Sequence, residues 1–153
     1  MKERMADTNA LLVYNVLRTH GALAPFIDRG LRDLNLTGAQ FNALLALRDA
    51  GEQGVPLSEI GRHLVVTKSN VTGLIDRLER DGLVARSSAS DRRVTLARLT
   101  PKGAALLEAA LPRHQQLLET LLGGMTGEEK AQLIGLLTRL RRGLREQRTE
   151  GTS

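Results

Sequence analysis

The chain has 153 residues, which is long enough for one domain to bury a core without disulfides or structural metals. It contains no cysteine, so disulfides, thiolate metal sites and cysteine nucleophiles are excluded. The formal net charge is +5. The segment from Arg62 to Lys102 contains nine basic and four acidic residues and so accounts for the whole net charge. Such a concentration of positive charge is typical of a surface that binds a polyanion. The N-terminus is polar and no run of about 18 uncharged apolar residues is present, so we expect a soluble, cytoplasmic protein with no membrane partner.

The first third of the chain is predicted to be helical. Apolar residues recur three or four positions apart over residues 8–34, which is the period of an amphipathic helix, and Pro25 is expected to kink or interrupt it. Thr37 and Gln40 have the spacing of a capping box at the start of a second helix, which extends to about Ala50.

Two shorter helices and a hairpin are predicted next. Pro56 is expected in the first turn of a short helix in PLSEIGRHL. Thr67 is predicted to cap another helix, which reaches about Asp81 and ends at Gly82. The strand candidates LVARS and VTLARLT flank SASDR, whose serine and aspartate residues favour a turn.

Two long helices complete the pattern. One begins at Pro101 and the other near Thr126, and the second carries a stripe of leucines at Leu133, Leu136, Leu137, Leu140 and Leu144. The arginines of residues 139–148 are interpreted as charge that the helix dipole stabilises in the last turns. Long striped helices at both chain ends have too little to pack against in so small a monomer, so we expect a homodimer.

This order of elements predicts a mainly α protein with a small β-hairpin wing (α+β). A short helix, a tight connection, a second helix and a hairpin together form a winged helix-turn-helix. We expect an N-terminal dimerisation helix at residues 1–36, a DNA-binding lobe at 37–100, C-terminal dimerisation helices at 101–148 and a disordered tail at 149–153.

The helix that follows Thr67 has two distinct faces. Its apolar residues Val71, Leu74, Ile75 and Leu78 follow the helical period and are predicted to face the core. The opposite side and its flanks carry Lys68, Ser69, Asn70, Thr72, Gly73, Asp76, Arg77 and Arg80. Small, hydrogen-bonding residues at the N-terminal end suit entry into a DNA major groove. A capped surface helix with an Asp76–Arg80 pair explains the same residues, and the helix alone does not decide between the two interpretations.

Residues 57–103 resemble the core signature of the MarR family of bacterial transcriptional regulators. The resemblance rests on the order GLV, DRR, LT and G, and on matches at Thr67, Ser69, Val71, Thr72, Asp76, Arg77, Leu78, Gly82, Leu83, Val84, Arg86, Asp91, Arg93, Leu99, Thr100 and Gly103. It extends to LTGAQFNALLAL before this stretch and GEEKAQLIGLLTRL after it. The family implies a homodimer of winged-helix lobes that binds a pseudo-palindromic operator and releases it when a small ligand binds. Gly73 stands where the family often has a longer residue, so base readout is expected to depend on Lys68, Ser69, Asn70 and Thr72.

The predicted DNA-binding residues lie on this helix and on the hairpin: Thr67, Lys68, Ser69, Asn70, Thr72, Arg77, Arg86, Asp91, Arg92 and Arg93. Arg92 and Arg93 are expected near the tip of the wing, where a guanidinium group can enter a narrow minor groove or bind phosphate. The resemblance implies that Asp91 holds Arg93 in place. Arg98 is expected to be strand-flank charge, and Arg86 is a candidate for a pair within the hairpin; a solvated hairpin remains the alternative for these two.

A small-molecule effector is implied by the resemblance, at the junction of the terminal helices with the lobe. Tyr14, His20 and Arg48 are candidates to line its pocket, although each is also explained as an ordinary surface residue.

Two other classes of function are alternatives to a DNA-binding regulator. The three histidines, His20, His63 and His114, are widely separated, and the chain has no HExxH, phosphate-binding glycine loop or GxSxG motif, so we expect no enzyme, no cofactor, and neither catalytic nor metal-binding residues. A winged helix used for protein or RNA contacts is the alternative. The aromatic residues all lie outside the basic segment, so there is no stacking platform for single strands and double-stranded DNA is the better partner.

Overall fold

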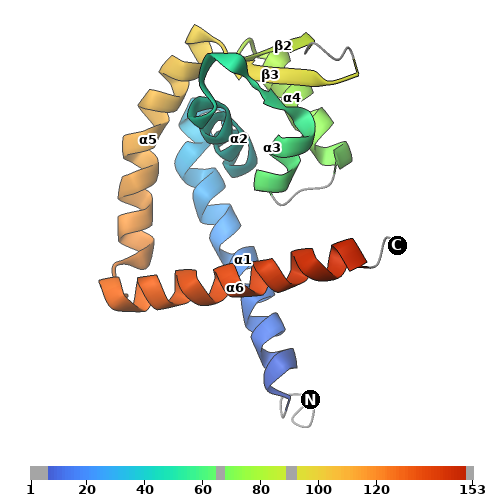
Figure 1. The fold of residues 1–153 in the computed structure, drawn as a ribbon. Coiled ribbons are helices and arrows are strands. Elements are labelled where there is room, and N and C mark those ends of the chain that lie inside the picture. The colour runs from blue at the N-terminus through green and yellow to red at the C-terminus, as the bar shows by residue number, and fades with distance from the viewer. Residues whose placement is uncertain (1–6, 65–67, 89–92, 151–153) are drawn as a thin grey trace. The chain divides into compact units, whose positions relative to one another are not determined.

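The computed structural model describes residues 7–64, 68–88 and 93–150 (Figure 1). Its α-helices are α1 (Thr8–Leu31), α2 (Gly38–Asp49), α3 (Leu57–Leu64), α4 (Lys68–Arg80), α5 (Pro101–Leu122) and α6 (Gly127–Glu150). Its strands are β1 (Val55–Pro56), β2 (Val84–Ser88) and β3 (Thr95–Leu99), and 3-10 turns cover Arg32–Leu34 and Gly51–Gln53. The predicted fold class, mainly α with a small β-hairpin wing, is confirmed.

Helix α1 continues through Pro25, so of the two expected effects the interruption is wrong and a kink stays a prediction. Proline removes one hydrogen bond from the helix, and packing on its C-terminal side outweighs that loss. There Leu31 is fully buried, and Asp28 accepts a 2.7 Å hydrogen bond from the backbone of Gly38. The α-helix ends three residues earlier than predicted, because the chain tightens into a 3-10 turn and then turns at Asn35, which has a left-handed φ of 53°.

The capping box at the start of α2 is confirmed. The backbone N–H of Gln40 donates to the Thr37 hydroxyl at 3.2 Å, and the Thr37 N–H donates to the Gln40 side chain at 2.9 Å. Two of the backbone donors that a helix start leaves unpaired are therefore satisfied. The cap fixes the position of α2, whose Phe41, Leu44 and Leu47 are the centre of the core.

The sheet has three antiparallel strands in the order β1-β3-β2, not the two of the predicted hairpin. Val84 pairs with Leu99 and Ser88 with Thr95 in the hairpin itself, as expected for the wing. Strand β1 adds Val55 opposite Ala97 and Pro56 opposite Leu96. Pro56 therefore lies in a strand and not in the first turn of α3, which begins one residue later.

One core connects these elements. It contains Leu31 of α1, the inner face of α2, Ile60 of α3, the stripe of α4, Val84 and Ala97 of the sheet, and Leu107 and Ala110 of α5. Each element contributes only a few side chains, so the lobe is stable only when all of them pack together. In Figure 1 the N-terminal part of α1 extends away from the sheet, and its Leu12, Val13 and Leu17 are exposed.

The chain divides into two compact units, one up to Leu117 and the other from Leu118 onwards. The second contains the end of α5 and the whole of α6. Helix α6 begins after Thr126, as predicted, and a capping box that was not predicted starts it: the Thr126 N–H donates to Glu129 at 2.7 Å, and the Glu129 N–H donates to the Thr126 hydroxyl at 3.2 Å. Ile134, Leu136 and Leu144 are exposed on this helix. None of the described helices is apolar over a length sufficient to cross a membrane.

Candidate nucleic-acid interface

Helix α4 presents the two faces that its sequence predicts. Val71, Ile75 and Leu78 are buried, and Leu74 at the margin is half-buried. Asn70, Thr72 and Gly73 are exposed on the outer side, and a Cβ at Gly73 would meet no atom within 4 Å. The outer face near the start of α4 is therefore small, polar and open.

The C-terminus of α4 turns directly into the wing. The N–H of Leu83 donates to the carbonyl of Leu78 at 2.8 Å, and the N–H of Gly82 donates to that of Glu79 at 2.9 Å. This pair of bonds is a Schellman motif, which requires a left-handed residue, and Gly82 supplies it with a φ of +72°. Because the helix ends in a fixed geometry, β2 leaves it in a fixed direction.

The start of α5 closes the same junction from the other side. The Thr100 hydroxyl donates to the Gly82 carbonyl at 2.7 Å and accepts from the Gly103 N–H at 3.0 Å. The Lys102 ammonium donates to the Asp81 carbonyl at 2.7 Å, where a cation also stabilises the end of α4. The LT-x-x-G end of the sequence signature is therefore a structural clamp on the helix that leads into the wing.

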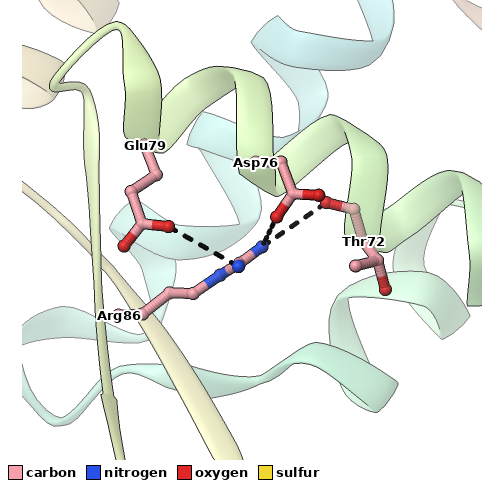
Figure 2. Close-up of polar contacts among 4 residues, drawn as sticks. All are labelled: Thr72, Asp76, Glu79 and Arg86. Atoms are coloured by element: carbon pink, nitrogen blue, oxygen red, sulfur yellow. Dashed lines mark hydrogen bonds and ion pairs between the residues drawn. The ribbon is translucent and has the colours of Figure 1, made fainter.

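Arg86 on β2 lies against α4, as Figure 2 shows. One terminal nitrogen, Nη2, is 2.5 Å from Oδ1 of Asp76, and the other, Nη1, is 3.5 Å from Oε2 of Glu79. Nη2 also donates to the Thr72 carbonyl at 3.4 Å. The pair within the hairpin, for which Arg86 was a candidate, is therefore wrong, because its guanidinium pairs with α4 instead. It also reaches the Asp76 carboxylate, which the alternative surface-helix interpretation paired with Arg80.

The remaining predicted DNA-binding residues are only partly described. Arg77 is exposed on α4, and Arg93 and Arg98 are exposed on the wing. Lys68 and Ser69 are the first two residues of α4. Thr67, Asp91 and Arg92 lie outside the described residues, so the contact between Asp91 and Arg93 stays a prediction.

The three candidate effector residues lie on α1 and α2, and their role in a pocket stays a prediction. The Tyr14 hydroxyl accepts a 3.0 Å hydrogen bond from Arg18, and Arg48 pairs with the adjacent Asp49 at 3.2 Å. His20 is exposed six positions after Tyr14 on α1, which places the two side chains about 120° apart around the helix. No hydrogen bond or ion pair joins any two of the three.

His114 has a packing role that its position in the sequence did not reveal. Its ring lies on that of Phe41, with 4.4 Å between the centroids, and its Nδ1 is buried without a hydrogen-bond partner. Burial lowers the pKa of this imidazole below its usual value, because a charged ring would lose its hydration there. No three histidine or acidic side chains converge as metal ligands in the part of the chain that the structure describes.

Known proteins resemble this chain in both sequence and fold. The pattern that defines the MarR family matches residues 34–94. The transcriptional repressor NicR of Pseudomonas putida is 34% identical over 109 residues, which are 71% of this chain and 68% of that protein. The transcriptional regulator MhqR of Bacillus subtilis is 26% identical over 137 residues, which are 89% and 93% of the two chains.

Solved structures agree. BpsR of Bordetella bronchiseptica, described as regulated in its DNA binding by 6-hydroxynicotinic acid, is 30% identical, with a TM-score of 0.77 over 86% of this chain and 98% of that one. A MarR mutant from E. coli complexed with operator DNA is 29% identical, with a TM-score of 0.77 over 84% and 92%. The chain therefore belongs to the MarR family of helix-turn-helix transcriptional regulators.

Proposed function

We propose that this protein is a repressor that binds a pseudo-palindromic operator in double-stranded DNA as a homodimer and is released by a small-molecule effector. The observation that carries the proposal is the outer face of α4, which is polar, open and fixed in direction by the clamp at its C-terminus. The E. coli relative complexed with operator DNA supports it.

Helix α4 is the element that reads the operator. A side chain can reach base edges in the major groove only where the backbone approaches closely, and Gly73 keeps the middle of the outer face free of bulk. We assign base contacts to Lys68, Ser69, Asn70 and Thr72 near the helix start. Arg77, farther along the helix, contacts phosphate and so helps to set the register of the helix in the groove.

The wing extends the interface along the DNA. Strands β2 and β3 form the wing, and we assign the guanidinium groups of Arg92 and Arg93 to the adjacent minor groove or to phosphate. Asp91 orients Arg93. Arg98, near the end of β3, is surface charge that contributes less to DNA binding.

The dimer forms through the two ends of the chain. Leu12, Val13 and Leu17 on α1 and Ile134, Leu136 and Leu144 on α6 are all at least half exposed in the single chain. Large apolar side chains that a single chain leaves exposed along a helix are typical of a protein interface. We therefore assign residues 1–36 and 101–148 to dimerisation and residues 37–100 to DNA binding. Helix α6 extends to Glu150, so the expected disordered tail is wrong at residues 149 and 150, and residues 151–153 lie outside the described residues.

The effector acts by population shift. In some conformations of the dimer the spacing of the two lobes does not match the two half-sites of the operator. A ligand that binds these conformations more tightly lowers the affinity for the operator. Regulation of BpsR by 6-hydroxynicotinic acid makes a small aromatic acid a reasonable first compound to test. The protein acts in the cytoplasm, without a catalytic step.

Selection of DNA from a random pool tests the proposal. The purified protein should enrich an inverted repeat, and its affinity for that duplex should fall steeply as salt rises, because bound basic residues release counterions. Tight binding of a protein or RNA partner, with no enrichment of any duplex, would instead support an interaction module. Repeating the selection with candidate aromatic acids tests the effector separately.

A further inference from the structure

Arg86 is predicted from its position in the signature to bind DNA, yet its side chain is committed to the protein. Only 25% of it is exposed, and both terminal nitrogens face carboxylates of α4 (Figure 2). Its Nε is buried without a hydrogen-bond partner, so a phosphate cannot reach that atom unless the side chain moves.

We propose that Arg86 is a positioning residue that fixes the rotation of α4 about its own axis against the wing and makes no phosphate contact. The inference rests on the proposed function, in which the outer face of α4 reads DNA. It separates Arg86 from the residues that touch the operator.

The first argument is geometric. Thr72, Asp76 and Glu79 are spaced i, i+4 and i+7, so they form one line along the side of α4. The guanidinium of Arg86 contacts all three residues from β2. Rotation of α4 in either direction would carry this line away from the strand and break the contacts together. Because Asn70 and Thr72 lie on the same two turns, their direction depends on that rotation.

The second argument is electrostatic. Asp76 and Glu79 are like charges three positions apart, which repel each other, and both lie toward the C-terminus of α4, where the helix dipole disfavours acids. Without a cation between them they would also repel the DNA backbone. Arg86 is placed where it neutralises both carboxylates. A lysine would keep the charge but lacks the planar fork that contacts two partners at once.

Three variants and one control test the role of Arg86. Arg86→Lys keeps the charge and removes the fork. Arg86→Gln removes the charge and the fork. Arg86→Gln combined with Asp76→Asn restores the net charge of the group formed by residues 76, 79 and 86, and it leaves two uncharged side chains that can still form hydrogen bonds. Arg98→Gln on β3 is the control, because it removes an exposed arginine from the adjacent strand. Each full-length variant is titrated with the selected operator and with a scrambled duplex at several salt concentrations, and its thermal unfolding is recorded.

The positioning role predicts that Arg86→Lys lowers operator affinity by roughly 5- to 50-fold and changes scrambled-duplex affinity by less than about twofold. The slope against salt stays that of the wild type, since no phosphate contact is lost. The double variant should bind the operator more tightly than Arg86→Gln alone. Arg86→Lys keeps a cation between the two carboxylates, so it provides the test even if Arg86→Gln fails to fold.

Three results would overturn the inference. A direct phosphate contact predicts that Arg86→Gln loses about one unit of salt slope per subunit and is not rescued by Asp76→Asn. A role in stability alone predicts equal losses on both duplexes together with a lower melting temperature. Operator preference that is unchanged in Arg86→Lys excludes positioning. If the wild-type protein prefers no sequence at all, it is the proposed function that fails, and the inference falls with it.

Discussion

The carbonyl oxygen of Leu83 occupies the space that a side chain at Gly103 would need. A Cβ at residue 103 would clash with that oxygen, which belongs to the backbone that connects α4 to β2. The Leu83 carbonyl is held in turn by the Thr100 N–H at 3.1 Å. The entry of α5 and the exit of α4 are thus packed backbone to backbone.

Gly103→Ala should therefore lower the free energy of unfolding by at least about 2–3 kcal/mol, because the backbone must shift to admit the methyl group. Gly73→Ala is the matched control. It lies in open space in a helix interior, where alanine is expected to raise the free energy of unfolding by about 0.5–1 kcal/mol. Urea denaturation of both variants measures the difference. Equal stability of the two would contradict the described junction.

Stability should depend on the ionisation of His114. Its pKa is lowered in the folded state by burial, so the unfolded chain binds a proton first as pH falls. Neutral His114 therefore makes its full contribution to the free energy of unfolding above pH 6.5, which is about the pKa of a histidine in the unfolded chain. This contribution is lost as the pH falls from that value toward the lower pKa of the folded state. Denaturation curves between pH 8 and 5 should reveal this loss in the wild type.

His114→Leu should reduce the slope of stability against pH in that window, because leucine can occupy the site beside Phe41 but cannot titrate. His20→Asn, which changes an exposed histidine of α1, is the control and should keep the wild-type slope. A slope that is unaffected in His114→Leu would show that other groups cause the pH dependence.

Charge on the exposed apolar side chains should prevent dimerisation without unfolding the chain. Leu17 and Leu144 are 66% and 56% exposed in the single chain, so glutamate at either position costs the monomer little. In an apolar interface the same carboxylates would be desolvated. We expect Leu17→Glu combined with Leu144→Glu to sediment as a folded monomer. Gln132→Glu, an exposed change elsewhere on α6, should remain dimeric; dimers in both proteins would refute the assigned interface.

The faces of α4 could be predicted from sequence because they depend on local spacing. The helical period places Val71, Ile75 and Leu78 on one face of α4, and an apolar face of this kind is expected to be buried, as it is. The end of α4 was equally predictable, because the left-handed conformation at the C-terminus of a helix strongly favours glycine, and Gly82 supplies it.

Non-local pairing explains what was missed. Strand β1 has only two residues, too few to show an alternating pattern, and it pairs with β3 some forty positions later. Pro56 misled the prediction because a proline is equally common in the first turn of a helix. The partner of Asp76 was missed for a related reason. The i, i+4 rule favours Arg80, but the hairpin brings Arg86 beside α4, and its fork reaches two carboxylates instead of one.

Three single substitutions measure whether α4 and the wing bind duplex DNA. Arg93→Ala, Asn70→Ala and the control Arg98→Ala are titrated with the selected operator and its single-base variants over a range of salt. Asn70→Ala should relax preference at particular base pairs and leave the salt slope nearly unchanged, because base contacts specify sequence.

Arg93→Ala should weaken operator binding by about 1–3 kcal/mol and reduce the salt slope by about one unit for each wing, through the loss of a charged groove or backbone contact. Arg98→Ala should change both quantities much less. If Arg93→Ala binds every duplex as the wild type does at every salt concentration, the arginines of the wing are solvated surface charge and the wing does not bind DNA.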